Sequence, residues 1–238
     1  MKLDILAFGA HPDDVELSCS GTLLKHIKAG KKVGLVDLTR GELGTRGTVA
    51  IRDSEAAEAA KILGLSVREN LNMQDCFFVN DKANKLEVVK IIRKYQPEII
   101  IANAVSDRHP DHGRAAALVS EAAFLAGLIK VETASEGKKQ DAWKTKAVYH
   151  YIQDRHIKPD FVIDITDLMP KKIEGIMAHK SQFYDPNSKE PLTPISTKEF
   201  LEFLEGRAID FGRSIGVKYA EGFTVERTAG VKSLFDLM

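Results

Sequence analysis

The sequence predicts an α/β fold, in which a doubly wound, mostly parallel sheet carries helices on both faces. Short apolar runs alternate with amphipathic stretches of helical length along most of the 238 residues. The runs, such as PEIIIANA at 97–104, are apolar at nearly every position, which is typical of parallel strands covered by helices. Strand, helix and strand follow one another in order, so we expect right-handed crossovers.

The first half of the chain contains four predicted pairs of strand and helix. Apolar runs predict strands at 4–10, 32–38, 66–71 and 97–104. Helical periodicity predicts helices at 15–30, 50–63, 82–95 and 113–129. Gly30 and Gly64 fit helix ends, because glycine readily adopts the left-handed conformation of a C-terminal cap.

The second half is less regular. A polar stretch at 131–145 predicts a surface loop. Two strands, at 147–152 and 161–165, precede a helix at 167–181. Three prolines predict an extended loop at 184–197, before a helix at 197–214 and a terminal YAEGFTVER segment. We expect one domain over 1–238, with the last third wrapped onto the sheet.

Composition excludes several classes of function. Lys plus Arg and Asp plus Glu number 34 each, so no overall field attracts nucleic acid or an anionic membrane. No segment approaches the roughly 20 apolar residues that span a bilayer, and the N-terminus lacks a secretory pattern. Two cysteines in no CxxC pattern predict neither a disulfide framework nor a thiolate zinc site. We therefore expect a cytoplasmic protein without membrane or nucleic-acid partners.

Two loops carry the same unusual chemistry. HPDD at 11–14 follows the first predicted strand, and HPDH at 109–112 follows the fourth. In an open α/β sheet, ligands bind at the carboxyl ends of the strands, where both loops should lie. Either motif alone could be ordinary turn or helix-capping chemistry. Two histidine-rich loops at equivalent strand ends instead favour a shared site.

The residue types favour a metal. Imidazole and carboxylate suit Zn²⁺, which in catalytic sites commonly has three protein ligands and one open position. His11, Asp14 and His112 would supply such a set. Fe²⁺ or Co²⁺ would fit similar ligands.

Two further residues are left beside the expected metal. Asp13 is placed to act as a general base toward water, and His109 to stabilise an oxyanion or protonate a leaving amine. These parts describe metal-assisted hydrolysis of an acyl bond. Which of the two protonates the amine stays open, as does a non-catalytic metal-binding or sugar-binding protein.

A glycine-rich stretch, TRGELGTRGT at 39–48, suggests two other interpretations. It could cradle phosphate in a nucleotide-binding oxidoreductase, but it follows the second strand and lacks both the GxGxxG and GxxxxGK[ST] spacings. We favour a rim of the pocket. Arg52, just beyond it, either binds substrate or pairs with Glu55 on an exposed helix face.

Together these motifs resemble the PIG-L/LmbE-like family of zinc-dependent N-acetylglucosamine deacetylases. The resemblance is carried by AHPDDVE (10–16), TRGELGTRG (39–47), RDSEAAEAA (52–60) and HPDHG (109–113), and extends to HKSQFYDPNS and IGVKYAEGF. Those last stretches are similar to the branch that deacetylates N-acetylglucosaminyl malate in bacillithiol biosynthesis. Other members act on related conjugates, including chitobiose.

The resemblance implies a Rossmann-like sheet and a set of roles. Zinc would be held by His11, Asp14 and His112, with Asp13 as base and His109 at the oxyanion, while Arg52 would contact the sugar. It also implies a homo-oligomer and a small amino-sugar substrate. Arg108 is a candidate for the malate carboxylates, and Gln182 lies where it could reach the pocket.

One position departs from the family pattern. Some relatives have a tyrosine two residues before the first histidine of the second motif, where this chain has Asp107. If that tyrosine polarises the acetyl oxygen, another group must replace it here. Tyr184 and Tyr219 are the candidates.

Overall fold

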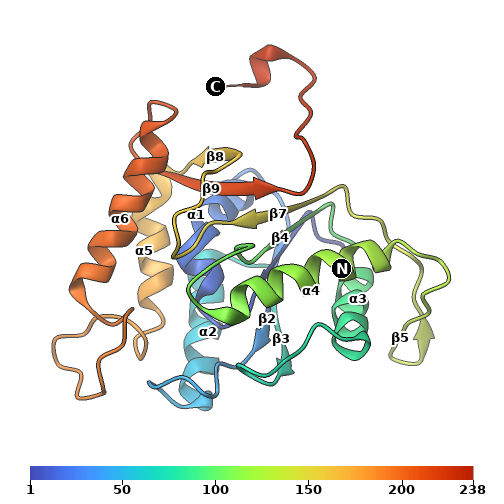
Figure 1. Ribbon diagram of the computed structural model, residues 1–238, viewed down its shortest axis with the longest axis horizontal. Coiled ribbons are helices and arrows are strands. Elements are labelled where there is room, and N and C mark those ends of the chain that lie inside the picture. The colour runs from blue at the N-terminus through green and yellow to red at the C-terminus, as the bar shows by residue number, and fades with distance from the viewer. Residues whose placement is uncertain (238) are drawn as a thin grey trace.

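The structure, a computed structural model, describes residues 1–237 and is built on a seven-stranded sheet (Figure 1). Its strands, in the order β3-β2-β1-β4-β7-β9-β8, are Val67–Met73, Val33–Thr39, Ile5–Gly9, Ile99–Ala102, Ala147–Tyr151, Ala220–Val225 and Phe161–Asp164. The α-helices are α1 (Asp14–Lys28), α2 (Val49–Leu63), α3 (Lys82–Tyr95), α4 (Pro110–Ala126), α5 (Met169–Met177) and α6 (Lys198–Arg213). Strands β3 through β7 are parallel, as the sequence predicts.

The two faces of the sheet have separate apolar cores. Helices α3 and α4 pack together over one face, whereas α1, α2 and α5 pack over the other, with α6 beside β9 (Figure 1). Alternate residues of β1 enter each core: Leu6 and Phe8 face α3 and α4, while Ile5 and Ala7 face α1. Every residue of β1 is buried, which explains why its sequence is continuously apolar.

The sheet reverses its direction of growth at β1. Ile5 pairs with Val33 of β2 on one side and with Ile99 of β4 on the other. The loops that leave β1 and β4 therefore diverge to opposite faces and leave a crevice at the carboxyl edge, where this class of fold binds ligands. HPDD and HPDH are the sequences of these loops.

The helix starts differ slightly from expectation in a way that affects the site. Helix α4 begins at Pro110 rather than 113, because proline fits the first turn of a helix, where its missing N–H is not needed. His112 consequently lies in the first turn of α4 and not in a loop. Helix α1 begins at Asp14, with Asp13 as its cap residue.

The C-terminal part holds the larger differences. YAEGFTVER forms β9, which runs antiparallel to β7 and β8 and lies between them. The predicted loop at 131–145 contains a short hairpin of β5 (Ala134–Ser135) and β6 (Lys138–Lys139). Helix α5 ends at Met177, so His179 and Gln182 belong to the turns that follow it. No helix among residues 1–237 combines the length and apolar character needed to span a bilayer.

A buried ion pair joins this part to α1. Lys172 of α5 donates to Glu221 of β9 at 2.6 Å, and both side chains are 3% exposed. Glu221 also accepts hydrogen bonds from the amides of Gly21 and Thr22 within α1. The ammonium group additionally donates to the carbonyl of Leu17. This cluster has no excess charge and holds three elements together.

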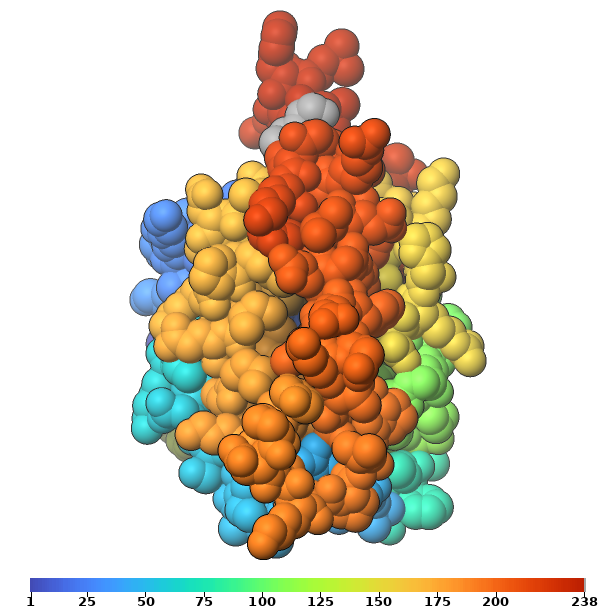
Figure 2. Space-filling view, turned by 90° about the vertical axis from the view of Figure 1, so that its left-hand side faces the viewer, coloured from blue at the N-terminus to red at the C-terminus, as the bar shows by residue number. Residues whose placement is uncertain are grey.

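The chain then leaves the body. Residues 228–237 form an arm that projects beyond the sheet (Figures 1 and 2). Its tip is a short 3-10 turn, η2 (Leu234–Asp236), closed by a reciprocal capping box between Ser233 and Asp236. All residues of the arm are exposed.

Candidate active site

The two histidine-rich loops meet around Asp14. Nε2 of His112 lies 3.2 Å from one oxygen of the Asp14 carboxylate, and Nδ1 of His11 lies 3.6 Å from the other. The rings of His11 and His112 are 5.6 Å apart, centre to centre. The three residues expected to hold a metal therefore bring one nitrogen each, and a carboxylate, to a common point.

The other nitrogen of each imidazole faces a second carboxylate. Nε2 of His11 lies 3.1 Å from Asp75 and 3.3 Å from Asp111. Nδ1 of His112 lies 2.5 Å from Asp107. A carboxylate in this position fixes the tautomer and the ring orientation of a metal-binding histidine and increases its basicity.

The Asp14 carboxylate is itself held from several sides. It is 2% exposed and accepts hydrogen bonds from the His11 amide, from Asn103 after β4 and from Gln153 after β7. Three donors in fixed positions leave the carboxylate little rotational freedom. The site is therefore assembled before any ligand arrives.

The electrostatics favour positive charge at this point. Burial alone would lower the pKa of His11, but hydrogen bonds to Asp111, Asp14 and Asp75 raise it well above its ordinary value. Burial likewise opposes the charge on His112, yet Asp14 and Asp107 raise its pKa to about 9. Burial would raise the pKa of Asp14, and the facing imidazoles instead hold it well below its usual range.

This environment fits a divalent cation. Two imidazole nitrogens and a carboxylate are typical zinc ligands, and the surrounding carboxylates would compensate the charge. Ligand atoms of His11, His109 and His112 also lie within 4.8 Å of one another and could hold a metal ion. The same spacing joins His11 to Asp75 and Asp111, but those carboxylates already accept from backbone amides, Leu43 and Cys76 respectively.

Asp13 has a strained backbone at the cap position of α1. Its φ of 128° is a conformation that residues other than glycine rarely adopt, and its side chain makes no capping hydrogen bond. The carboxylate lines the pocket and lies 3.4 Å from the Arg52 guanidinium. Burial raises the pKa of Asp13 to about 6 against the attraction of Arg52. Such a value suits a base that works near neutral pH.

Arg52 is buried and bridges the two rims of the pocket. It donates to the carbonyls of Gly41 and Pro12, in addition to facing Asp13. A side chain on Gly41 would place its Cβ 1.8 Å from the guanidinium, so glycine is required there. The exposed pair with Glu55 is wrong, because Glu55 instead binds the amide and hydroxyl of Ser181.

His109 stands beside both metal-facing imidazoles. Its ring is 4.6 Å from that of His11 and 5.3 Å from that of His112, centre to centre. Its Nδ1 accepts from the amide of Asp111, which leaves the proton of the neutral ring on Nε2. Burial, followed by repulsion from the other two rings, lowers the pKa of His109. His109 is therefore equipped to donate a hydrogen bond as a neutral imidazole.

The rim of the pocket comes from both halves of the chain. Leu43 and Gly44 line it from the glycine-rich loop, and Ile195 lines it from the proline-rich loop. Arg108 lines it too, but its guanidinium pairs with Asp154 at 2.5 Å. Gln182 lines the pocket and donates to the carbonyl of Arg46.

Sequence reasoning missed the carboxylates behind the imidazoles. Asp75 follows β3, and its place at the carboxyl end of a predicted parallel strand was the signal that could have identified it. Asp107, at the position where some relatives have tyrosine, binds His112. The two tyrosines considered as substitutes are not among the described residues that line the pocket, and Tyr219 donates to Glu205.

A second buried network lies behind the site. Glu16 of α1 accepts from Arg68 of β3 at 2.5 Å, and Arg68 also binds Asp37 of β2 through two nitrogens. His179, fully buried, lies 3.2 Å from Glu16. Burial would raise the pKa of Glu16, but the attraction of Arg68, then of His179, lowers it to about 2.

Comparison with known proteins agrees with this geometry. A family model described as PIG-L, GlcNAc-PI de-N-acetylase, matches residues 6–123. The diacetylchitobiose deacetylase of Thermococcus kodakarensis is 30% identical, with 92% of this chain and 81% of that protein covered. A probable N-acetyl-α-D-glucosaminyl L-malate deacetylase 2 of Bacillus anthracis is 27% identical, with 75% and 81% covered. The crystal structure of a conserved protein from Thermus thermophilus superposes with a TM-score of 0.85 at 32% identity, covering 97% of this chain and 98% of that one.

Proposed function

The chain belongs to the PIG-L family of de-N-acetylases, hydrolases of carbon–nitrogen bonds, and on that premise we propose that it removes the acetyl group from an N-acetylglucosamine conjugate. The observation that carries the proposal is the pair of imidazoles, each aimed by a carboxylate toward Asp14. Neither packing nor capping requires two such triads to converge in a pocket.

We propose His11, Asp14 and His112 as the ligands of a divalent metal, Zn²⁺ or alternatively Fe²⁺ or Co²⁺. When bound, the metal supplies Lewis acidity and a low pKa for water. The choice of Asp14 over His109 as third ligand is supported by the hydrogen bond that occupies Nδ1 of His109 and by the three donors that fix Asp14.

The remaining chemistry belongs to Asp13 and His109. Asp13 lines the pocket with a pKa near neutrality, so it accepts the proton of the attacking water. His109 donates from Nε2 toward the oxygen of the acetyl group as negative charge develops there. Arg52 keeps the Asp13 carboxylate ionised and oriented. The proton that the leaving amine needs can return from Asp13.

Sequence resemblance favours N-acetylglucosaminyl malate as the substrate, whereas the rim favours an uncharged conjugate such as diacetylchitobiose. A malate group carries two carboxylates and would need free cations. Arg108 is paired with Asp154, and Arg52 is committed to Asp13 and two carbonyls. Leu43 and Ile195 would pack against a sugar ring instead. We therefore propose a neutral glucosaminide as the better substrate and the malate conjugate as the second.

Metal analysis combined with an amine-release assay tests these proposals. The purified protein should bind one divalent metal per chain and release acetate from diacetylchitobiose faster than from N-acetylglucosaminyl malate. His112→Ala should lose metal and activity, while His156→Ala, at an exposed histidine, should keep both. Full metal content in His112→Ala would remove that residue from the ligand set. Metal binding without acetate release from either substrate would indicate a non-catalytic metal-binding protein.

A single substitution separates the two substrates. Asp154→Asn frees the Arg108 guanidinium. It should raise kcat/KM for the malate conjugate several-fold and leave that for diacetylchitobiose unchanged. Equal changes for both substrates would contradict a role of Arg108 in recognising the second group.

A further inference from the structure

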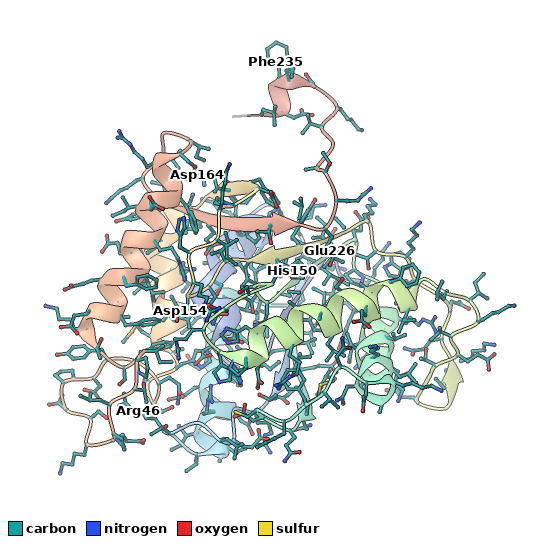
Figure 3. The ribbon with its side chains drawn as sticks, in the orientation of Figure 1. Arg46, His150, Asp154, Asp164, Glu226 and Phe235 are labelled. Carbon is teal, nitrogen blue, oxygen red and sulfur yellow. The ribbon has the colours of Figure 1, made fainter. Side chains whose placement is uncertain are left out.

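The C-terminal arm, residues 228–237, exposes apolar side chains that nothing in its own chain covers. Leu234 is 83% exposed, Phe235 is 98% exposed and Leu237 is 59% exposed. Figure 3 shows Phe235 at the tip of the arm, far from the sheet. Single exposed apolar residues are common, but three within four positions on a projecting segment mark a contact surface.

The tip has a defined shape although it does not touch the body. Asp236 accepts from the amides of Lys232 and Ser233, and Ser233 accepts from the amide of Phe235. These local bonds hold the 3-10 turn that turns Phe235 outward. A segment whose polar groups are satisfied locally and whose apolar groups are exposed is prepared for burial against another surface.

A groove lies beside the root of the arm. It is formed by the end of α4, by the segment entering β7 and by the residues that follow β9, and it encloses about 1220 Å³. Phe124 and Leu128 form its apolar wall, 71% and 40% exposed, and Val148 contributes to its floor. We call it the α4 groove. Glu226 and Arg227, the last residues before the arm, also line it, and Glu226 pairs with His150 as labelled in Figure 3.

The charges of arm and groove are complementary. The arm carries Lys232 and Asp236 around its apolar residues. The groove offers Glu226 for the lysine and Lys144 for the aspartate. Among residues 1–237, Lys144 forms no ion pair, whereas the neighbouring Lys85 and Lys146 are already paired with Glu121 and Glu98.

We propose that the arm of one chain docks in the α4 groove of a second copy of the chain. Because groove and arm root adjoin, a two-fold axis near Arg227 would place each arm on the partner's groove, which gives a closed, symmetric dimer. Arg227 fixes the root by donating to the carbonyl of Lys146 at the groove edge. The eight residues from there to Phe235 can span up to roughly 28 Å, enough to cross an interface. This inference does not depend on the reaction proposed above.

Sedimentation velocity of the full chain over a range of concentrations tests the proposal. We expect a dimer whose dissociation constant rises at least a hundredfold in Leu234→Asp, since each dimer contains two arms. Leu192→Asp is the matched control, because Leu192 is also 83% exposed but lies in the proline-rich loop. A monomer at all concentrations, or a dimer indifferent to Leu234→Asp, would overturn the proposal.

Disulfide trapping distinguishes a partner's groove from the chain's own. Cys76→Ser removes the one partly exposed thiol among the described residues. In that background, chains carrying only Phe235→Cys are mixed with chains carrying only Phe124→Cys. A mixed covalent dimer is the expected product. If the mixture gives none, while the double variant forms an intramolecular disulfide, the arm covers its own groove and the second copy is excluded.

Discussion

Helix α1 contacts two buried charge clusters that differ in one respect. At its N-terminus, Asp14 faces two imidazoles that are surrounded by further carboxylates and open to a pocket. In its middle, Gly21 and Thr22 donate to Glu221, which Lys172 neutralises at 2.6 Å out of contact with solvent. The first cluster has an excess of negative charge and access for a ligand, whereas the second is balanced and closed.

The difference separates function from architecture. A balanced, closed ion pair can only hold elements in place, and its free energy is a matter of folding. An open cluster with surplus carboxylates lacks a cation, which a ligand must supply. Changes at the first cluster should therefore act on metal and turnover, and changes at the second on unfolding.

Asp13→Asn should break the catalytic cluster most severely. The amide cannot accept the proton of water, so kcat should fall by roughly 10²- to 10⁴-fold while metal content stays normal. Steady-state kinetics with metal analysis measures both. Asp53→Asn, at the partly exposed partner of Arg40, is the control and should keep normal turnover. Near-normal activity in Asp13→Asn would remove Asp13 from the mechanism.

Lys172→Met should have the largest effect on folding. It leaves the buried Glu221 with two backbone amides and no cation, which should lower the free energy of unfolding by about 3–5 kcal/mol. Lys171→Met, at the exposed neighbour that pairs with Glu174, should cost less than about 1 kcal/mol. Urea unfolding measures both. If the activity of the folded Lys172→Met protein also fell a hundredfold, the separation of the two clusters would fail.

Asp107→Asn should weaken the metal site without removing a ligand. Loss of the carboxylate behind His112 should reduce metal affinity or activity by about 10- to 100-fold. Competition with a chelator measures the affinity. Asp154→Asn, in the neighbouring loop but away from the imidazoles, should leave metal affinity unchanged. Unchanged affinity in Asp107→Asn would mean that Asp107 only shapes the loop.

Glu16→Gln should have the smallest effect at neutral pH and change mainly the response to acid. The folded pKa of Glu16, about 2, lies below the ordinary value of 4.5, so its ionisation stabilises the protein above pH 4.5. That contribution is lost as the pH falls toward 2. Urea unfolding at pH 5 and pH 3 should therefore show a smaller loss of stability in Glu16→Gln than in the unmodified protein. An exposed control, Glu174→Gln, should not alter the pH dependence.

Much of the parallel half of the fold could be predicted because its strands are apolar at every position and its helices are strongly periodic. The approach of HPDD and HPDH followed from one topological rule about strand ends. Strand β9 could not be predicted in place, since its antiparallel position between β7 and β8 depends on contacts distant in sequence. Local patterns contain no information about such pairing.

The limits at the site have a similar cause. His11, Asp14 and His112 stand in recognisable motifs, whereas Asp75 and Asp107 are isolated carboxylates whose partners lie on other loops. Arg52 shows the reverse case: its position near the pocket could be predicted, but its commitment to Gly41, Pro12 and Asp13 could not. Side chains without a motif acquire their roles only in three dimensions.

The φ of 128° at Asp13 also bears on how this chain can be improved in the laboratory. Glycine adopts that backbone without strain, so Asp13→Gly would relieve on the order of 1–3 kcal/mol at the cap of α1. A search for thermostable variants that scored only folding would therefore enrich glycine at position 13 and recover robust but inert proteins. Any such search has to select for turnover in every round, because at this residue stability and turnover favour different amino acids.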